Sequence, residues 1–260
     1  MNLPIVIIGC GRMGGAFARA WRTSRPVLAF DPNAQIPEGV EAIASLDAIP
    51  SQAIVLLAIK PQRLPEAAPA LRAVLGEGHL VVSIAAGITL ATLRAQLGTA
   101  PALVRAMPNT PVAVGKGMTA AIAETMLDPA ACTTLEQLFT ETGSFLWLEA
   151  EDQLDAVTAI SGSGPAYFYR FAEALAAAGA AQGLPAPIAY ELARATLAGA
   201  GALAAPGTDL AQLRIEVTSP GGTTAAALAA MEAAGIDGLA VTGVGAAIRR
   251  AGELAVEAAR

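Results

Sequence analysis

Four β-branched residues run into a glycine-rich turn in Ile5-Val6-Ile7-Ile8-Gly9-Cys10-Gly11-Arg12-Met13-Gly14. The apolar run predicts a buried strand, and the segment that follows the turn predicts a helix. In the spacing G-x-G-x-x-G, the first glycine permits a tight turn and the second lets a pyrophosphate approach. The third lets the helix pack close to the strand. The stretch therefore predicts the opening of a Rossmann domain, with six residues next to a dinucleotide: Ile8, Gly9, Gly11, Arg12, Met13 and Gly14.

The next predicted strand, Val27–Phe30, ends at Asp31, roughly 20 residues after the first glycine. An acidic side chain at this position accepts hydrogen bonds from the adenosine ribose and repels a 2′-phosphate. Asp31 therefore favours NADH over NADPH as the cofactor. Two alternatives to this interpretation stay open. Asp31 also suits a purely structural turn before Pro32, and Arg12 can approach the 2′-phosphate of NADPH from the glycine turn.

Short apolar runs alternate with helical segments over residues 1–150, which predicts βαβ units and a mostly parallel sheet. Strands are predicted at Ile5–Ile8, Val27–Phe30, Ile54–Ala58, Leu80–Ile84, Leu103–Ala106, Thr119–Ala123 and Phe145–Leu148. Helices are predicted at Gly14–Thr23, Leu64–Leu75, Leu90–Leu97 and Pro129–Glu141.

Beyond Asp152 the strand signals stop. Helices are predicted at Gln153–Ile160, Pro165–Gln182, Ala186–Ala205, Leu210–Val217, Thr223–Ala234 and Leu239–Ala259. We therefore expect an α/β Rossmann domain over residues 1–150 and an all-α domain over residues 151–260. The helices have wide apolar faces that so small a domain cannot bury, which predicts a homodimer through these C-terminal helices.

The composition narrows the partners and the location of the protein. The chain has 260 residues, of which 54% are hydrophobic, and a net charge of −6, which argues against a nucleic-acid partner. Gly, Pro and charged residues interrupt every apolar run before it reaches the roughly 20 residues of a membrane span. Two cysteines and one histidine, His79, argue against a zinc site, and His79 is expected at the surface. The first strand follows Met1 closely, so we expect a cytoplasmic protein with no metal and no membrane partner.

Small residues follow two further strands, where parallel strands meet a dinucleotide. Ala58-Ile59-Lys60-Pro61 follows one of them and Ser83-Ile84-Ala85-Ala86-Gly87 the next. The residues expected to lie close to the cofactor are Ala58, Lys60, Ala85, Ala86 and Gly87. Asn109 follows the next strand, between two prolines that stiffen its loop, and is expected to contact the cofactor as well, although a structural turn explains this loop equally well.

Two segments in the second half expose backbone donors beside hydroxyl side chains. Ser161-Gly162-Ser163-Gly164-Pro165 leads into a helix. Thr218-Ser219-Pro220-Gly221-Gly222-Thr223-Thr224 leads into another, and the open N–H groups of a helix start suit a small anion such as a carboxylate.

With these motifs the chain closely resembles the pyrroline-5-carboxylate reductases over nearly its whole length. The segments Ser161–Phe168 and Val217–Thr224 are the most specific to that family, and the glycine turn is shared with all Rossmann enzymes. The resemblance implies a Rossmann domain followed by an all-α dimerisation domain of the 6-phosphogluconate-dehydrogenase type. It also implies an interlocked dimer, rings of dimers, and an active site at the domain junction that helices of the partner subunit complete.

Site residues carry over from the family to matching positions in this sequence. The substrate carboxylate loop falls on Gly221, Gly222, Thr223 and Thr224, and Ser163 is expected to contact the substrate. Thr158 matches a threonine placed near the ring nitrogen, so Thr158 and Thr224 are the expected catalytic residues. Many family members have Ser, Arg or Asn where this chain has Asp31-Pro32, so the usual preference for NADPH is open here.

The implied reaction is the last step of proline synthesis. Hydride passes from NADH or NADPH to the imine carbon of 1-pyrroline-5-carboxylate, giving L-proline. An iminium accepts hydride readily, and the motifs offer hydroxyls and backbone donors rather than a strong acid, so catalysis is expected to come from positioning.

Three other functions remain to be weighed. A β-hydroxyacid dehydrogenase needs a lysine on the first long interdomain helix, and Gly164–Leu175 has none. A reductase of another small cyclic imine acid, such as the six-membered homologue, fits the same motifs. A non-catalytic NAD(P)-binding protein of the same fold is the third alternative. The presence of both the cofactor turn and the carboxylate loop in one chain disfavours it.

Overall fold

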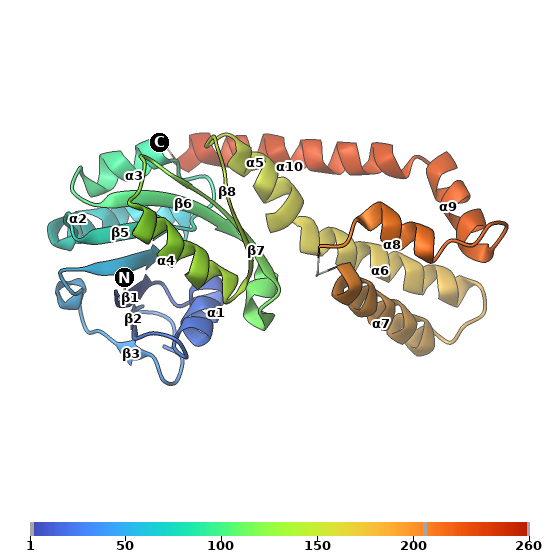
Figure 1. Ribbon diagram of the computed structural model, residues 1–260, viewed down its shortest axis with the longest axis horizontal. Coiled ribbons are helices and arrows are strands. Elements are labelled where there is room, and N and C mark those ends of the chain that lie inside the picture. The colour runs from blue at the N-terminus through green and yellow to red at the C-terminus, as the bar shows by residue number, and fades with distance from the viewer. Residues whose placement is uncertain (1–2, 205–206, 259–260) are drawn as a thin grey trace. The chain divides into compact units, whose positions relative to one another are not determined.

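The computed structural model describes residues 3–204 and 207–258 (Figure 1). The chain forms two compact units: Met1–Ser163 with Ala247–Arg260, and Gly164–Ala246. The predicted boundary between residues 150 and 151 therefore lies inside the first unit. The segment after it stays with the sheet because Leu154 and Ala159 are fully buried there. Helix α10 (Ile236–Ala258) contributes residues to both units.

One eight-stranded sheet forms the centre of the first unit (Figure 1). Its strands are β1 (Ile5–Ile8), β2 (Val27–Phe30), β3 (Glu41–Ala42), β4 (Ala53–Leu57), β5 (His79–Ser83), β6 (Ala102–Pro108), β7 (Gly117–Ala123) and β8 (Gly143–Trp147). They lie in the order β3-β2-β1-β4-β5-β6-β7-β8. All neighbours are parallel except β6 and β7, which confirms the expected mostly parallel sheet. The direction of the strand order changes between β1 and β4, and ligands of such sheets bind at the carboxyl ends of the strands at that point.

Helices cover both faces of this sheet, as continuously apolar parallel strands require. They are α1 (Arg12–Trp21), α2 (Leu64–Val74), α3 (Leu90–Leu97) and α4 (Pro129–Thr140), with short 3₁₀ turns η1 (Leu46–Ala48), η2 (Pro61–Arg63) and η3 (Thr110–Val114). Alternate residues of β1 belong to different cores, with Ile5 and Ile7 on one face and Val6 and Ile8 on the other. The sheet is thus held rigid from both sides, which fixes where its carboxyl-end loops lie.

The chain after β8 is helical, as expected. It forms α5 (Gln153–Val157), the π-helical turn η4 (Thr158–Gly162), α6 (Gly164–Ala181), α7 (Ala186–Ala204), α8 (Leu210–Glu216) and α9 (Thr223–Ala233) before α10. The predicted helix Gln153–Ile160 is therefore an α-helix that widens into a π turn. Helix α10 begins three residues before the predicted Leu239. The predicted helix ends Ala205 and Ala259 lie outside the described residues.

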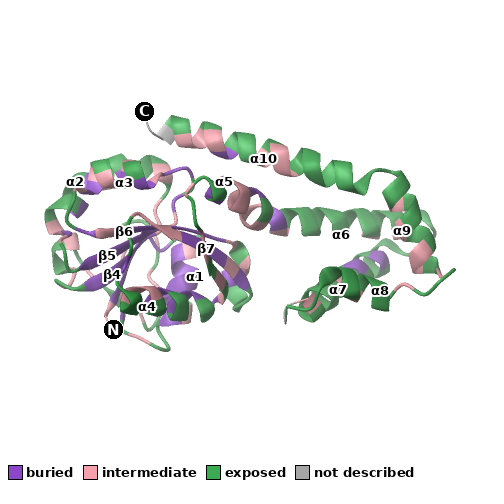
Figure 2. Cartoon of the chain, turned by 45° about the horizontal axis from the view of Figure 1, so that its top comes forward, coloured by how far each residue is buried: buried purple, intermediate pink, exposed green. Residues whose placement is uncertain are grey.

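The helices of the second unit bury little of their apolar surface within the chain (Figure 2). Phe168 is 64% exposed, and Phe171, Ile188 and Leu192 are also exposed. Large exposed apolar side chains on neighbouring helices, such as α6 and α7, indicate an interaction site. Among the described residues no single helix has the length and hydropathy to cross a membrane, but α9 and α10, bent by 54° at their break, pass that test as a pair.

Candidate active site

The geometry of the glycine turn gives each glycine a separate role. Gly9 has a φ of +99°, and a Cβ there would lie 2.7 Å from the Ala58 carbonyl oxygen. Gly14, in the first turn of α1, packs so closely on the Gly9 carbonyl that a methyl group has no room. Beside Gly11, in contrast, there is open space for a Cβ, and Gly11 is exposed. The turn therefore leaves one glycine face free, at the place where a pyrophosphate is expected to approach.

The other predicted residues of this site lie on the strand before the turn and on the helix after it. Ile8 is the buried last residue of β1, and Arg12 and Met13 are the first residues of α1. Arg12 is exposed, and Gly11 caps α1 without a side-chain hydrogen bond. The first turn of α1 therefore offers backbone donors and the positive end of the helix dipole to an anion.

The Asp31 carboxylate lies against the same turn. Its Oδ2 accepts a 2.7 Å hydrogen bond from the Cys10 N–H, and its Oδ1 accepts from the N–H groups of Asn33 (2.8 Å) and Ala34 (3.0 Å). Burial alone raises the pKa of Asp31, but the bonds from Asn33, Cys10 and Ala34 outweigh it, so the pKa lies below its usual value. Asp31 is thus an anion that holds the glycine turn and the β2 turn together.

The loops after β4 and β5 lie at the same edge of the sheet. Ala58 closes against Gly9, whereas Lys60 is exposed at the start of η2. In the second loop Ala85 and Gly87 are buried and Ala86 is exposed. Gly87 has a φ of +77°, and a Cβ there would lie 3.2–3.3 Å from backbone atoms of Leu254 and Ala255 in α10. The structure thus brings the predicted cofactor residues of β1, β2, β4 and β5 together.

The Asn109 side chain is engaged by the protein at both ends. Its Oδ1 accepts a hydrogen bond from the Met118 N–H at 2.8 Å, and its Nδ2 donates to the Ser161 carbonyl and Oγ, both at 3.2 Å. It therefore links the end of β6 to the π-helical turn. The contact with cofactor that the sequence suggests for Asn109 stays a prediction.

The π-helical turn places Thr158 and Ser163 at its two ends. The Ser163 N–H donates to the Thr158 carbonyl at 2.8 Å, an i→i+5 bond. The Thr158 hydroxyl donates to the Leu154 carbonyl at 2.7 Å, so its oxygen keeps only acceptor capacity for another group. Single π turns inside helices are frequent at functional sites.

In the second unit, the predicted carboxylate loop ends at the N-terminus of α9. Gly221 has a φ of +74°, and the Gly222 N–H donates to the Ser219 carbonyl at 3.0 Å. Gly222 is the N-cap of α9 and offers no side-chain capping bond, so the N–H groups of Thr223 and Thr224 face a helix start without a cap. A Cβ at Gly222 would lie 2.5 Å from the Ser219 Oγ, so a larger residue there would require the Ser219 hydroxyl to rotate away.

Two side chains of the first unit have no part in this chemistry. Burial, together with the nearby Asp31, raises the pKa of the Cys10 thiol to about 11, which fits a packing residue. The expected surface position of His79 is wrong: only 4% of it is exposed, at the start of β5. Its Nδ1 accepts from the Gly76 N–H at 2.8 Å and its Nε2 lies 2.9 Å from the Pro50 carbonyl. Sequence reasoning missed this because a lone histidine carries no periodic signal.

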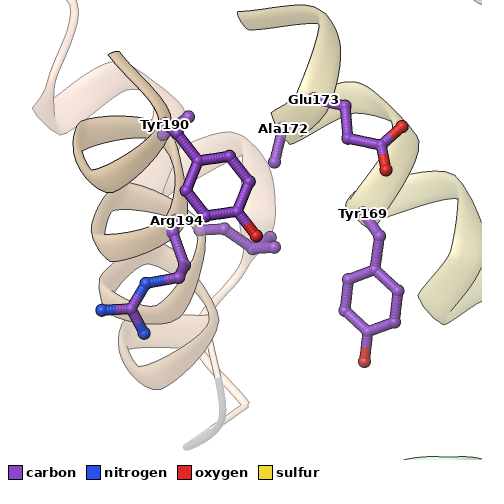
Figure 3. Close-up of a pocket in the computed structure, with 7 residues that line it drawn as sticks. Tyr169, Ala172, Glu173, Tyr190 and Arg194 are labelled. Atoms are coloured by element: carbon purple, nitrogen blue, oxygen red, sulfur yellow. The ribbon is translucent and has the colours of Figure 1, made fainter. Parts of the chain in front are cut away.

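Two cavities in the described chain lie away from the predicted residues. One of about 140 Å³ lies between α6 and α7, where Tyr169, Glu173, Tyr190 and Arg194 line it (Figure 3). It is smaller than the 300–1,000 Å³ typical of sites for small molecules. Another, of about 290 Å³, lies at the amino ends of β4 and β5, opposite the cofactor edge. Neither cavity contains a predicted site residue.

A buried ion pair near the site was not expected from the sequence. The Arg105 Nη1 lies 2.9 Å from the Glu151 Oε1, and the two side chains are 5% and 30% exposed. The same oxygen accepts a 2.8 Å bond from the Leu90 N–H at the start of α3. The only indication in the sequence is one arginine, Arg105, within an apolar strand, and this pattern does not identify Glu151 as its partner.

Comparisons with known proteins show which proteins the chain is similar to. The family model for pyrroline-5-carboxylate reductase dimerisation matches residues 151–254, and the model for NADP oxidoreductase, coenzyme F420-dependent, matches residues 4–87. A pyrroline-5-carboxylate reductase of Pseudomonas aeruginosa is 37% identical over 98% of both chains.

Two solved structures extend the likeness to three dimensions. A pyrroline-5-carboxylate reductase of Coxiella burnetii has a TM-score of 0.91 and 32% identity, over 98% of this chain and 99% of its own. A pyrroline carboxylate reductase of Plasmodium falciparum with NADP bound has a TM-score of 0.80 and 25% identity over 98% of both chains. The likeness thus covers both units.

Proposed function

The chain belongs to the pyrroline-5-carboxylate reductase family and is an NAD(P)H-dependent oxidoreductase that reduces 1-pyrroline-5-carboxylate to L-proline; from this premise we propose how its residues share the work. When bound, the reduced nicotinamide supplies the hydride that the imine carbon receives. The protein binds and orients both reactants and keeps the nitrogen protonated. The observation that carries the proposal is the joint presence of the open Gly11 face and the uncapped start of α9 in a chain that resembles these reductases throughout.

The residues of the first unit fit a dinucleotide. Methyl groups are excluded at Gly9 and Gly14 but not at Gly11, so the backbone is shaped to leave room at one place only. We propose that the main chain from Ile8 to Gly14 binds the pyrophosphate. The loops at Ala58–Lys60 and Ala85–Gly87 then line the nicotinamide half, and Asn109 is the remaining cofactor candidate.

We propose that NADH is preferred over NADPH. Asp31 is an anion with a lowered pKa, and its three backbone bonds hold its charge next to the glycine turn. A carboxylate has about four acceptor sites, so capacity remains for a ribose hydroxyl, whereas a 2′-phosphate would meet a like charge.

The proposed substrate residues act through hydrogen bonds and positioning. The N–H groups at Gly221–Thr224 bind the carboxylate at the start of α9, and Ser163 contributes a hydroxyl. Thr158 or Thr224 is proposed to contact the ring nitrogen, directly or through water. Because the Thr158 hydroxyl already donates to Leu154, it would accept a hydrogen bond from a protonated nitrogen rather than supply the proton.

The assembly proposed for the protein is a homodimer, with a ring of dimers as a higher form. The exposed apolar side chains of α6 and α7 support it, as does the dimerisation family that matches residues 151–254. Both cysteines, Cys10 and Cys132, are free, which suits a reducing compartment such as the cytoplasm. Sedimentation equilibrium at several concentrations tests the assembly: a monomer at micromolar concentration would contradict it.

A steady-state assay with 1-pyrroline-5-carboxylate and each nucleotide tests the function. Higher kcat/KM with NADH is the expected result. Preference for NADPH would keep the reaction and reduce Asp31 to a turn residue. The six-membered cyclic imine acid serves as the competing substrate, and no turnover of either imine, despite tight nucleotide binding, would favour a non-catalytic protein.

The carboxylate loop has its own test. Thr224→Ala is expected to raise the KM for the imine while the Kd for the nucleotide is unchanged. Unchanged catalytic efficiency in this variant would remove Thr224 from the site.

A further inference from the structure

The segment from Glu151 to Ser163 is joined to β6 at both of its ends. At its start, the Glu151 Oε1 accepts from the Arg105 Nη1 at 2.9 Å. Near its end, Ser161 accepts from Asn109, directly after β6, at 3.2 Å. Thr158 lies between the two contacts, so the position of its hydroxyl depends on both.

The contact at Glu151 joins three elements through one oxygen atom. Besides Arg105 of β6, this Oε1 accepts from the Leu90 N–H, the first of α3. The loop Ala85–Gly87 comes just before α3, so the same carboxylate fixes the start of the Thr158 segment and the end of that loop. Negative charge at the N-terminus of α3 is also favourable for the helix dipole.

The surroundings of Arg105 make this carboxylate hard to replace. The arginine side chain is 5% exposed, and its Nε has no hydrogen-bond partner in the described part of the chain. A buried guanidinium needs an anionic or polar partner, and here Glu151 supplies it.

The contact at Asn109 has a fixed direction. Since the Asn109 Oδ1 accepts from the Met118 N–H of β7 at 2.8 Å, its Nδ2 must face Ser161. Ser161 lies inside the π turn, and Pro165, four residues further on, has no N–H to donate to the Ser161 carbonyl. Asn109 thus satisfies a carbonyl of the turn and holds the turn against the sheet.

We propose that Glu151 and Asn109 are positioning residues for hydride transfer, which hold Thr158 in register with the Ala85–Gly87 loop. Neither side chain needs to touch the reacting atoms. The inference rests on the proposed function, because it takes Thr158 and this loop as parts of the active site. An error of about 1 Å in such a position is enough to cost about 100-fold in rate.

Four variants test this: Glu151→Ala, Glu151→Gln, Asn109→Ala and, as the matched control, Glu149→Ala at an exposed glutamate two residues earlier. Each is measured for kcat, KM, nucleotide Kd and melting temperature. The primary isotope effect with nucleotide deuterated at C4 is measured as well. Hydrogen–deuterium exchange of residues 84–90 and 152–163 gives a readout that does not depend on turnover.

Glu151→Ala and Asn109→Ala are expected to lower kcat about 10-fold or more and to raise the isotope effect, and Glu151→Ala is expected to leave the nucleotide Kd within about threefold. Glu151→Gln loses the charge that faces Arg105, so its melting temperature falls. Its amide oxygen still accepts from Arg105 and Leu90, so its kcat stays within about threefold of wild type. Exchange rises in both segments for Glu151→Ala, and Glu149→Ala matches wild type in every measurement.

Three results would overturn the proposal. One is a kcat for Glu151→Ala or Asn109→Ala within twofold of wild type. Another is a Glu151→Gln variant as slow as Glu151→Ala, which would make the role one of stability alone. The third is a weakened nucleotide Kd at unchanged kcat in Asn109→Ala, which would place that side chain on the cofactor.

The test remains decisive if the Glu151→Ala variant does not fold or if the wild-type protein is inactive. If Glu151→Ala does not fold, Glu151→Gln and Asn109→Ala carry the same test. If wild-type protein reduces no imine, the proposed function fails, while exchange that rises in both segments still supports the coupling between them.

Discussion

Alanine at Gly11 and alanine at Gly14 should separate the binding of the nucleotide from the stability of the fold. At Gly11 the backbone φ is −62° and no atom lies within 4 Å of the point where a Cβ would stand, so an alanine fits without strain. Losing a glycine N-cap costs about 0.5–1 kcal/mol, and the reduced entropy of the unfolded chain returns about 0.4–1 kcal/mol. The net change in the free energy of unfolding is therefore near zero, but the methyl group stands where the pyrophosphate would approach.

The same change at Gly14 meets the backbone carbonyl of Gly9, which cannot move without opening the turn. Overpacking of this kind costs about 1–3 kcal/mol, and about 2–4 °C of melting temperature per kcal/mol is expected for a chain of this size. Gly14→Ala should therefore melt about 2–12 °C below wild type.

Two measurements decide between the two glycines. Nucleotide titration by fluorescence should give Gly11→Ala a Kd at least about tenfold higher, a loss of about 1.4 kcal/mol, at an unchanged melting temperature. A Gly11→Ala variant that binds the nucleotide within twofold of wild type would refute the assignment of the pyrophosphate to this turn. A Gly14→Ala variant as stable as wild type would refute the packing argument.

Three further predictions concern single side chains. Asp31→Asn should shift the ratio of kcat/KM values toward NADPH. Since the pKa of Asp31 is lowered on folding, its charge stabilises the fold above the unfolded pKa of about 3.9, and this stabilisation is lost as the pH falls through the folded pKa. Denaturant titrations from pH 7 to pH 3 should therefore show the difference in free energy of unfolding between wild type and Asp31→Asn shrink at low pH. A difference that stays constant would contradict this. Thr158→Val should lower kcat/KM about tenfold without moving its pH profile, because the hydroxyl accepts a hydrogen bond from the ring nitrogen and does not supply the proton. Thr158→Ser should retain most activity, and a Thr158→Val variant as active as wild type would remove Thr158 from the site. In native protein at pH 8 the Cys10 thiol, with a pKa of about 11, should react with a thiol reagent far more slowly than the half-buried Cys132, as peptide mapping after alkylation would show; equal rates would mean that the turn opens.

The elements of the Rossmann unit could be predicted because their signals are local. The apolar run Ile5–Ile8, the turn glycines and the alternation of strands and helices each specify backbone geometry within a few residues. The strand β3 could not be predicted, because Glu41 and Ala42 carry no apolar pattern and pair with β2 only through its edge. The antiparallel pairing of β6 with β7 could not be predicted either, because the direction of a strand relative to its neighbour depends on contacts between segments and not on the local pattern of either strand.

The site shows the same division between local and distant causes. The residues of the glycine turn follow from spacing alone, whereas the bonds of Asp31 to Cys10 and of Asn109 to Ser161 join positions far apart in the chain. The π turn at Thr158–Gly162 reads as ordinary helix in the sequence, because its residues have no pattern that differs from α-helix. The donor that meets the Ser161 carbonyl of this turn comes from Asn109, 52 residues earlier, and no local pattern indicates that contact.

The exposed helices of the second unit support the same conclusion at the level of assembly. A helix that covers a core within its own chain buries its apolar stripe, but Phe168 and Phe171, three residues apart on one face of α6, are both exposed. The one buried residue of α6 is Gly164. Such a helix gains little from folding alone, because most of its stabilisation must come from tertiary packing. The second unit is therefore expected to depend on a partner surface for its stability. If so, its helices should melt at a temperature that rises with protein concentration, while a melting temperature independent of concentration would mean that the helices are stable in the single chain.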